Sequence, residues 1–244
     1  MRTTGTLILA LILALLATGC GGGGGDDSVA PAKGKANLKV TVVAKPKTGA
    51  KPFKSYQPTE AEKAEAAASK GDFELVDYDH LEGIVVWLES GGTAHTPGNV
   101  KISVQPKPQK PPLFAASVGD TASIANGGGK PVKLYSVSEG NEFDVGQLAP
   151  GAAKDQPLKS PGLIELLDGD TFEVVARIYV APGWGARIVP AGEATTFRDL
   201  DPGEYRVAAW HERMPGDEKS VTLVADRTRE MNLLIGVNAL PKVE

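Results

Sequence analysis

Short segments in which apolar and polar residues alternate recur along most of this chain, and they constrain its fold more than any other feature. In the first of them, Leu38, Val40 and Val42 alternate with Lys39 and Thr41. A period of two residues is typical of a strand that buries one face. Glycine, proline, asparagine and aspartate separate such segments, so the sequence predicts an all-β protein built from sandwiches or barrels. The other candidate strands lie at 83–89, 100–104, 121–125, 132–137, 163–167, 172–180, 203–210, 220–224 and 230–235.

One stretch departs from this pattern. Thr59-Glu60-Ala61-Glu62 forms a capping box, in which the first hydroxyl and the last carboxylate satisfy free backbone amides at the start of a helix. Glutamate, alanine and lysine then continue to residue 70 without a large apolar face. We expect a short, exposed helical insert over 59–70, either as a plain surface element or as a partner-binding one.

The N-terminus has the features of an export signal. Arg2 precedes an uninterrupted apolar run over residues 7–16, and small residues at 17–19 stand ahead of Cys20. A run of about ten residues is too short to cross a bilayer core of about 30 Å as a helix, which favours a cleaved signal peptide over 1–19. Small residues followed by a cysteine resemble the bacterial lipobox. That resemblance implies lipidation of Cys20, with an ordinary secretory signal and an incidental cysteine as the alternative.

Cys20 is the single cysteine of the chain. Once it carries lipid, no thiol remains for a disulfide, a thiolate nucleophile or a thiolate metal ligand. Residues 20–36 are rich in glycine and hold one large apolar side chain, Val29, so they predict a flexible tether. We therefore expect an exported protein, lipid-anchored to the cell membrane or the outer membrane.

Residues able to carry chemistry are few and scattered. The formal net charge is −4 and no basic cluster is interleaved with aromatic residues, which argues against a nucleic-acid partner. The three histidines, His80, His95 and His211, lie far apart and lack the spacing of a helical metal-binding pair. No nucleophile-elbow motif occurs. The sequence predicts a protein that is not an enzyme and that holds no cofactor and no metal.

Several motifs follow one another between residues 83 and 180. They are Gly83-Ile84-Val85-Val86-Trp87-Leu88, Phe114, Val118-Gly119-Asp120-Thr121, Asn126, Tyr135-Ser136, Asn141-x-Phe143-Asp144-x-Gly146, Pro150-Gly151 and Pro161-Gly162-Leu163. In this order they resemble the cupredoxin-like domains of the methylamine-utilisation type. The resemblance implies a Greek-key sandwich over 37–180, but this chain departs at the copper ligands. Residues 130–133 replace the first histidine, residues 167–173 replace the Cys-His-Met cluster, and a blue-copper site needs both imidazoles and a thiolate.

The C-terminal part contains the motif Thr196-Phe197-x-Asp199-Leu200-Asp201-Pro202-Gly203-Glu204-Tyr205-Arg206-Val207 with Trp210-His211-Glu212. Tyr205, Val207 and Ala209 are expected on one face of a strand that follows a tight Pro-Gly turn. After them, Trp210-His211-Glu212 is a candidate surface patch, or else a packing tryptophan beside a solvated histidine. The motif is similar to that of the carboxypeptidase-regulatory-like, or transthyretin-like, sandwich. This similarity implies a second, smaller sandwich over 181–244.

These observations predict a membrane-anchored lipoprotein of the cell envelope that works as a non-enzymatic binding or scaffolding module. Its expected partners are the membrane, through the lipid, and an unidentified envelope protein or glycan. One alternative is a metal-handling or electron-transfer accessory that brings two of the histidines at 80, 95 and 211 together. Another is a carbohydrate or cell-wall binding module, whose stacking platform would be Trp87, Trp184 or Trp210.

Overall fold

The computed structural model describes residues 29–46, 77–91 and 96–236, and every regular element within these ranges is a β-strand. The prediction of an all-β protein is therefore confirmed. The helical insert expected over 59–70 lies outside the described residues, as do the leader, Cys20 and His95. No helix in the described ranges is long and apolar enough to cross a bilayer.

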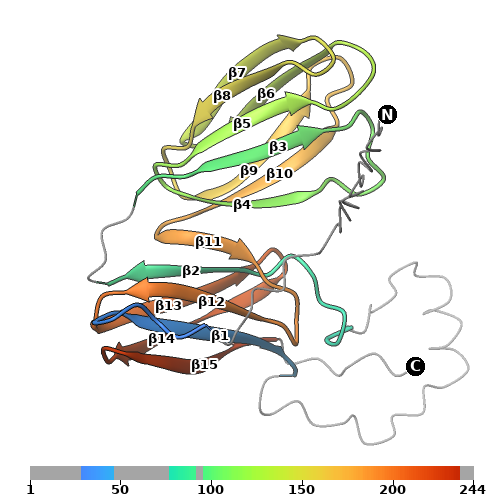
Figure 1. Cartoon of the computed structure of the whole chain (residues 1–244). Coiled ribbons are helices and arrows are strands. Elements are labelled where there is room, and N and C mark those ends of the chain that lie inside the picture. The colour runs from blue at the N-terminus through green and yellow to red at the C-terminus, as the bar shows by residue number, and fades with distance from the viewer. Residues whose placement is uncertain (1–28, 47–76, 92–95, 237–244) are drawn as a thin grey trace, which may run out of the picture.

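One group of strands forms the upper sandwich in Figure 1, here called the insert sandwich. Its two sheets have the strand orders β4-β10-β9-β6-β7 and β3-β5-β8, and the side chains between them include the fully buried Ile124, Ile164 and Ile178. Its strands are β3 (Asn99–Val104), β4 (Leu113–Ser117), β5 (Thr121–Asn126), β6 (Val132–Ser138), β7 (Asn141–Leu148), β8 (Ala153–Pro157), β9 (Gly162–Asp168) and β10 (Val174–Ala181).

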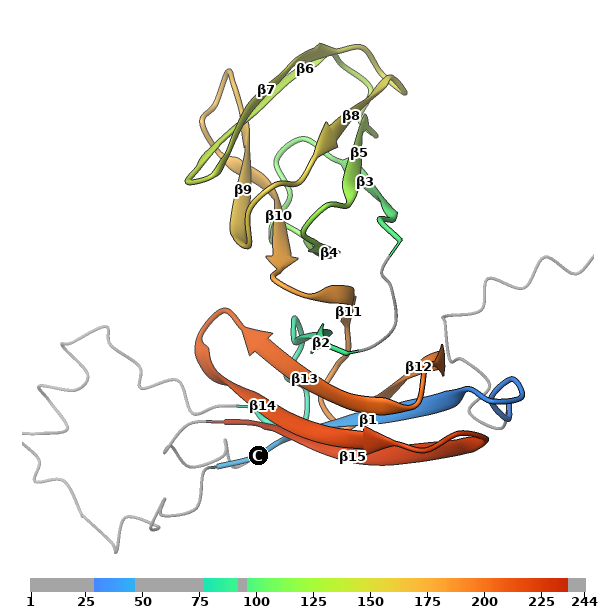
Figure 2. The same cartoon turned by 90° about the vertical axis from the view of Figure 1, so that its left-hand side faces the viewer.

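The remaining strands form the lower sandwich, here called the basal sandwich (Figure 2). Its sheets have the orders β12-β1-β15 and β11-β2-β13-β14, and a separate core that includes Leu38, Leu88 and Phe197 lies between them. Its strands are β1 (Ala36–Ala44), β2 (Val85–Ser90), β11 (Trp184–Ile188), β12 (Ala194–Leu200), β13 (Gly203–His211), β14 (Met214–Leu223) and β15 (Arg227–Ile235).

Side-chain alternation gives the burial that the sequence predicts. Leu38, Val40 and Val42 are fully buried in β1, whereas Lys39 and Thr41 are partly exposed. Successive side chains of a strand point to opposite faces, so a half-buried strand follows directly from this pattern.

Strand pairing divides the chain differently from the boundaries expected at 37–180 and 181–244. β1 lies between β12 and β15, and β2 lies between β11 and β13, so both belong to the basal sandwich. β2 and β11 pair as antiparallel neighbours, with Trp184 opposite Leu88 and Ile188 opposite Val85. The insert sandwich therefore interrupts a hairpin of the basal sandwich, because its residues run between these two paired strands.

The segment before β1 is tied to the basal sandwich, although the sequence predicts a tether up to residue 36. The Ala32 amide donates to Asp199 Oδ1 and the Gly34 amide donates to Asp226 Oδ1, each at 2.7 Å. Lys35 Nζ lies 2.6 Å from Asp201 Oδ1. The loops at one end of the basal sandwich thus hold the chain from about residue 32 onwards.

Candidate functional site

The candidate patch at 210–212 lies at the junction between the two sandwiches. Trp210, in β13, stacks on Tyr179 of β10 with ring centroids 3.9 Å apart and ring planes 13° apart. Trp87 of β2 lies on the same tyrosine, at 5.7 Å and a tilt of 45°. The residues next to each tryptophan in β2 and β13 point into the basal core, so the tryptophans themselves point away from it. The structure therefore uses Trp210 as a packing residue, the second of the two readings that the sequence left open.

Small apolar side chains complete the centre of this junction. Val85, Ala181 and Ala208 are buried there, and Leu113 and Ala115 of β4 pack against them. Offset aromatic rings contribute about 0.5–1.5 kcal/mol beyond the apolar area that they bury. The centre is thus apolar and close-packed.

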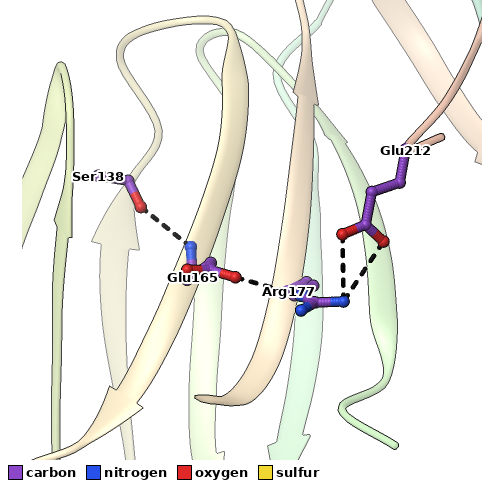
Figure 3. Close-up of polar contacts among 4 residues, drawn as sticks. All are labelled: Ser138, Glu165, Arg177 and Glu212. Atoms are coloured by element: carbon purple, nitrogen blue, oxygen red, sulfur yellow. Dashed lines mark hydrogen bonds and ion pairs between the residues drawn. The ribbon is translucent and has the colours of Figure 1, made fainter. Parts of the chain in front are cut away.

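An ionic bridge also crosses the junction (Figure 3). Arg177 of β10 places Nη1 3.3 Å from each carboxylate oxygen of Glu212, which lies in the β13–β14 turn. Its Nε lies 3.3 Å from Glu165 of β9, whose amide donates to Ser138 Oγ at 3.0 Å. These side chains are partly exposed, so each ion pair contributes at most about 1 kcal/mol. Together the pairs hold the β13–β14 turn against the insert sandwich.

A second ionic group lies on the outer face of the same basal sheet. Arg206 Nε is 2.9 Å from Glu89 and 2.9 Å from Glu218, each from a neighbouring strand. Burial, followed by the charge of Glu89, raises the pKa of Tyr179 above its usual value. The junction therefore has an apolar centre and charged edges, as protein interfaces commonly do.

His211 is the buried member of the candidate patch, with 8% of its surface exposed. The Arg213 amide donates to its Nδ1 at 3.2 Å. Burial, and then the charge of Arg213, lowers the pKa of His211 below 6.5. The alternative of a solvated histidine is therefore wrong, because His211 is buried at the end of β13.

The other candidate ligands do not come together within the described residues. His80 is exposed, and its Nδ1 lies 3.1 Å from both carboxylate oxygens of Asp77. Among residues 29–46, 77–91 and 96–236, no group of three or more histidine, cysteine, aspartate or glutamate side chains is placed to hold a metal. Trp184 is partly buried and packs against the basal core.

Asn126, just before residues 130–133, and Asp168, within residues 167–173, both hold turns. Asn126 is buried, and its side-chain amide donates to the carbonyls of Lys130 and Leu148. Asp168 Oδ1 accepts hydrogen bonds from the amides of Asp170 and Thr171. Both side chains satisfy backbone groups of loops at the ends of strands, which is a structural use.

Arg177 and Tyr179 are the junction residues that the sequence did not predict. Both lie in the predicted strand at 172–180, on the face opposite the buried Ile178 and Val180. A large polar and an aromatic side chain on the outer face of a strand only weakly indicate a contact with another sandwich, because most such residues face water. Their partners, Trp210 and Glu212, follow more than thirty residues later in the chain.

Replacing Trp210 with alanine should lower the free energy of unfolding by about 1–3 kcal/mol, because the partly buried indole loses its stack on Tyr179. Urea denaturation followed by circular dichroism measures this change. Val137→Ala is the matched control, since Val137 is 68% exposed on β6 and should change the value by less than about 0.5 kcal/mol. Equal effects of the two substitutions would show that the stack does not stabilise the junction.

Comparisons with known proteins found few similarities to this chain. No family model matches the chain, and no curated protein matches it. Among solved structures, a novel purple cupredoxin from Nitrosopumilus maritimus is 16% identical, with 28% of this chain and 77% of that chain covered at a TM-score of 0.26.

Proposed function

We propose that this chain is a membrane-anchored lipoprotein of the cell envelope that acts as a non-enzymatic scaffold. The observation that carries the scaffold role is the junction, where the side chains of the candidate patch join the two sandwiches to each other. Trp210 stacks on Tyr179, and Glu212 bonds to Arg177. A contact of this kind holds the two sandwiches in a fixed relation.

Connectivity supports the same proposal. The chain crosses between the sandwiches twice, from β2 to β3 and from β10 to β11, because the insert sandwich interrupts a hairpin. Two crossings restrict rotation more than a single linker does. Gly183 makes the second crossing possible, since a side chain there would collide with the Leu88 carbonyl and the Trp87 ring.

Attachment at the N-terminus supports the anchoring role. The hydrogen bonds of Ala32 and Gly34 to Asp199 and Asp226 connect the start of the described chain directly to the basal sandwich. A lipid on Cys20 would therefore position the basal sandwich nearest its point of attachment, with the insert sandwich carried on it.

Lipidation is tested by replacing Cys20 with serine in the native host. With an alkyne-labelled fatty acid in the growth medium, the wild-type chain should become labelled and Cys20→Ser should lose at least about nine-tenths of that label, because serine lacks the thiol that the lipid needs. His80→Asn, a substitution of an exposed side chain, is the matched control and should label as the wild type does. Equal labelling of the serine variant would contradict the anchor.

The scaffold role is tested in the same cells by chemical cross-linking of the envelope. Partners that require both sandwiches should be recovered with the wild-type chain and lost from a Trp210→Ala, Glu212→Gln double variant. Undiminished recovery with the double variant would contradict a role for the fixed junction.

The two alternatives receive no specific support from the described residues. Among the described residues, no group of three or more histidine, cysteine, aspartate or glutamate side chains is placed to hold a metal. A glycan platform needs an open tryptophan face, whereas Trp87 is 6% exposed and Trp210 is stacked on Tyr179.

A further inference from the structure

His211 occupies a position from which its charge would act on the junction. It is the last residue of β13, it pairs with Met214 of β14, and the turn between them consists of Glu212 and Arg213. Trp210, which stacks on Tyr179, precedes it, and Glu212, which bonds to Arg177, follows it. His211 is therefore directly flanked in the chain by the two residues that make the junction contacts.

Hydrogen bonding requires the uncharged ring. The backbone amide of Arg213 can only donate, so Nδ1, 3.2 Å away, must carry a lone pair. The remaining proton is then on Nε2, and the backbone of Glu82 is a hydrogen-bond partner of the ring. Protonation would place two donors face to face at Nδ1 and break the bond that shapes the turn.

Charged groups around the ring come from three elements. Arg213 and Glu212 lie in the turn itself, Glu82 lies just before β2, and Lys110 lies in the loop before β4. Arg213 and Lys110 oppose a charge on His211, whereas Glu212 and the backbone of Glu82 favour it. Lys110 Nζ also lies 3.4 Å from Glu82 Oε2, a further contact between the insert sandwich and the basal sandwich.

We propose that His211 is a proton sensor of the junction: its protonation breaks the Arg213 hydrogen bond, displaces the β13–β14 turn and releases the insert sandwich from the basal sandwich. This inference is independent of the membrane anchor and of the scaffold role. It requires only that the turn carries the contacts of Trp210 and Glu212.

The direction of the pH dependence follows from linkage. The docked form binds the proton less readily than a free histidine, so the docked form is most stable above about pH 6.5 and loses stability as the pH falls below it. In that range the ratio of released to docked molecules rises by up to about tenfold for each pH unit, since one proton is taken up.

The experiment is ¹⁹F NMR of the full chain in detergent micelles, labelled with 5-fluorotryptophan and titrated from pH 8 to pH 5. Its three tryptophans give three resonances, assigned by Trp→Phe substitution. The Trp87 and Trp210 resonances should shift together, with the same midpoint as the His211 ring measured by ¹³C-histidine NMR. Constant Trp87 and Trp210 resonances while His211 titrates would overturn the proposal.

Three substitutions distinguish the titration of His211 from that of other groups. His211→Asn keeps an acceptor for the Arg213 amide but cannot be protonated, and it should abolish the transition, whereas His80→Asn should leave it unchanged. Arg213→Ala removes an opposing cation on an exposed side chain, so it should raise the midpoints of His211 and of the tryptophans by the same amount. A tryptophan transition that survives in His211→Asn, or whose midpoint stays fixed while that of His211 moves, overturns the proposal.

Discussion

Replacing Tyr205 with alanine should lower the free energy of unfolding of the basal sandwich by about 3–5 kcal/mol. Tyr205 is 1% exposed and lies in the same core as Phe197 and Leu38. Its ring also lies against the backbone of Gly91, where an added Cβ would collide with ring carbons. Alanine would leave a cavity that the surrounding residues cannot fill unless the backbone moves. The loss of stability should therefore lie near the upper end of the range for truncation of an aromatic side chain.

Tyr205→Phe is the matched control for this prediction. Tyr205 Oη donates to the Asp201 carbonyl at 2.9 Å, which closes the turn before β13 in the manner of a tyrosine corner. Phenylalanine keeps the ring and loses the hydroxyl that makes this hydrogen bond, so it should cost about 1 kcal/mol. Urea denaturation of both variants measures the difference. If alanine costs no more than phenylalanine does, then the ring does not fill the core as the structure describes.

The burial of Tyr205 could be predicted from the sequence because it follows from local geometry. A Pro-Gly turn at 202–203 begins the strand, and alternation from there places Tyr205, Val207 and Ala209 on one face. All three are buried, at 1%, 0% and 3% exposure. Local pattern was sufficient here, since a strand can bury only one of its two faces against a single core.

Pairing partners could not be predicted in the same way. The alternation at 38–42 indicates which face of β1 is buried, but it does not indicate which strands lie beside it. In the structure β1 runs parallel to β15, with Val40 opposite Met231, nearly two hundred residues later in the chain. The junction contacts could not be predicted for the same reason. Trp210 faces outward from the basal sandwich, so the local pattern predicts a surface residue, and that pattern does not indicate that the insert sandwich covers it.

The pairing of β2 with β11 leads to the prediction with the largest structural effect. Replacing residues 91–182 with an Asn-Gly turn should leave a chain that still folds as the basal sandwich. The remaining strands β1, β2 and β11–β15 keep both sheets, and their core is separate from that of the insert sandwich. An Asn-Gly turn suits a tight hairpin between antiparallel neighbours.

The shortened chain should show a cooperative urea transition and a β-type circular dichroism spectrum, with stability lowered by about 2–3 kcal/mol. The loss follows from the junction, where Val85, Trp87 and Ala208 lose the side chains that cover them. A second version with Trp87→Thr and Trp210→Thr removes the apolar surface that excision exposes, so aggregation alone cannot decide the result. If neither version unfolds cooperatively, the basal sandwich depends on the insert for its fold, and the insert is then an integral part of a single folding unit.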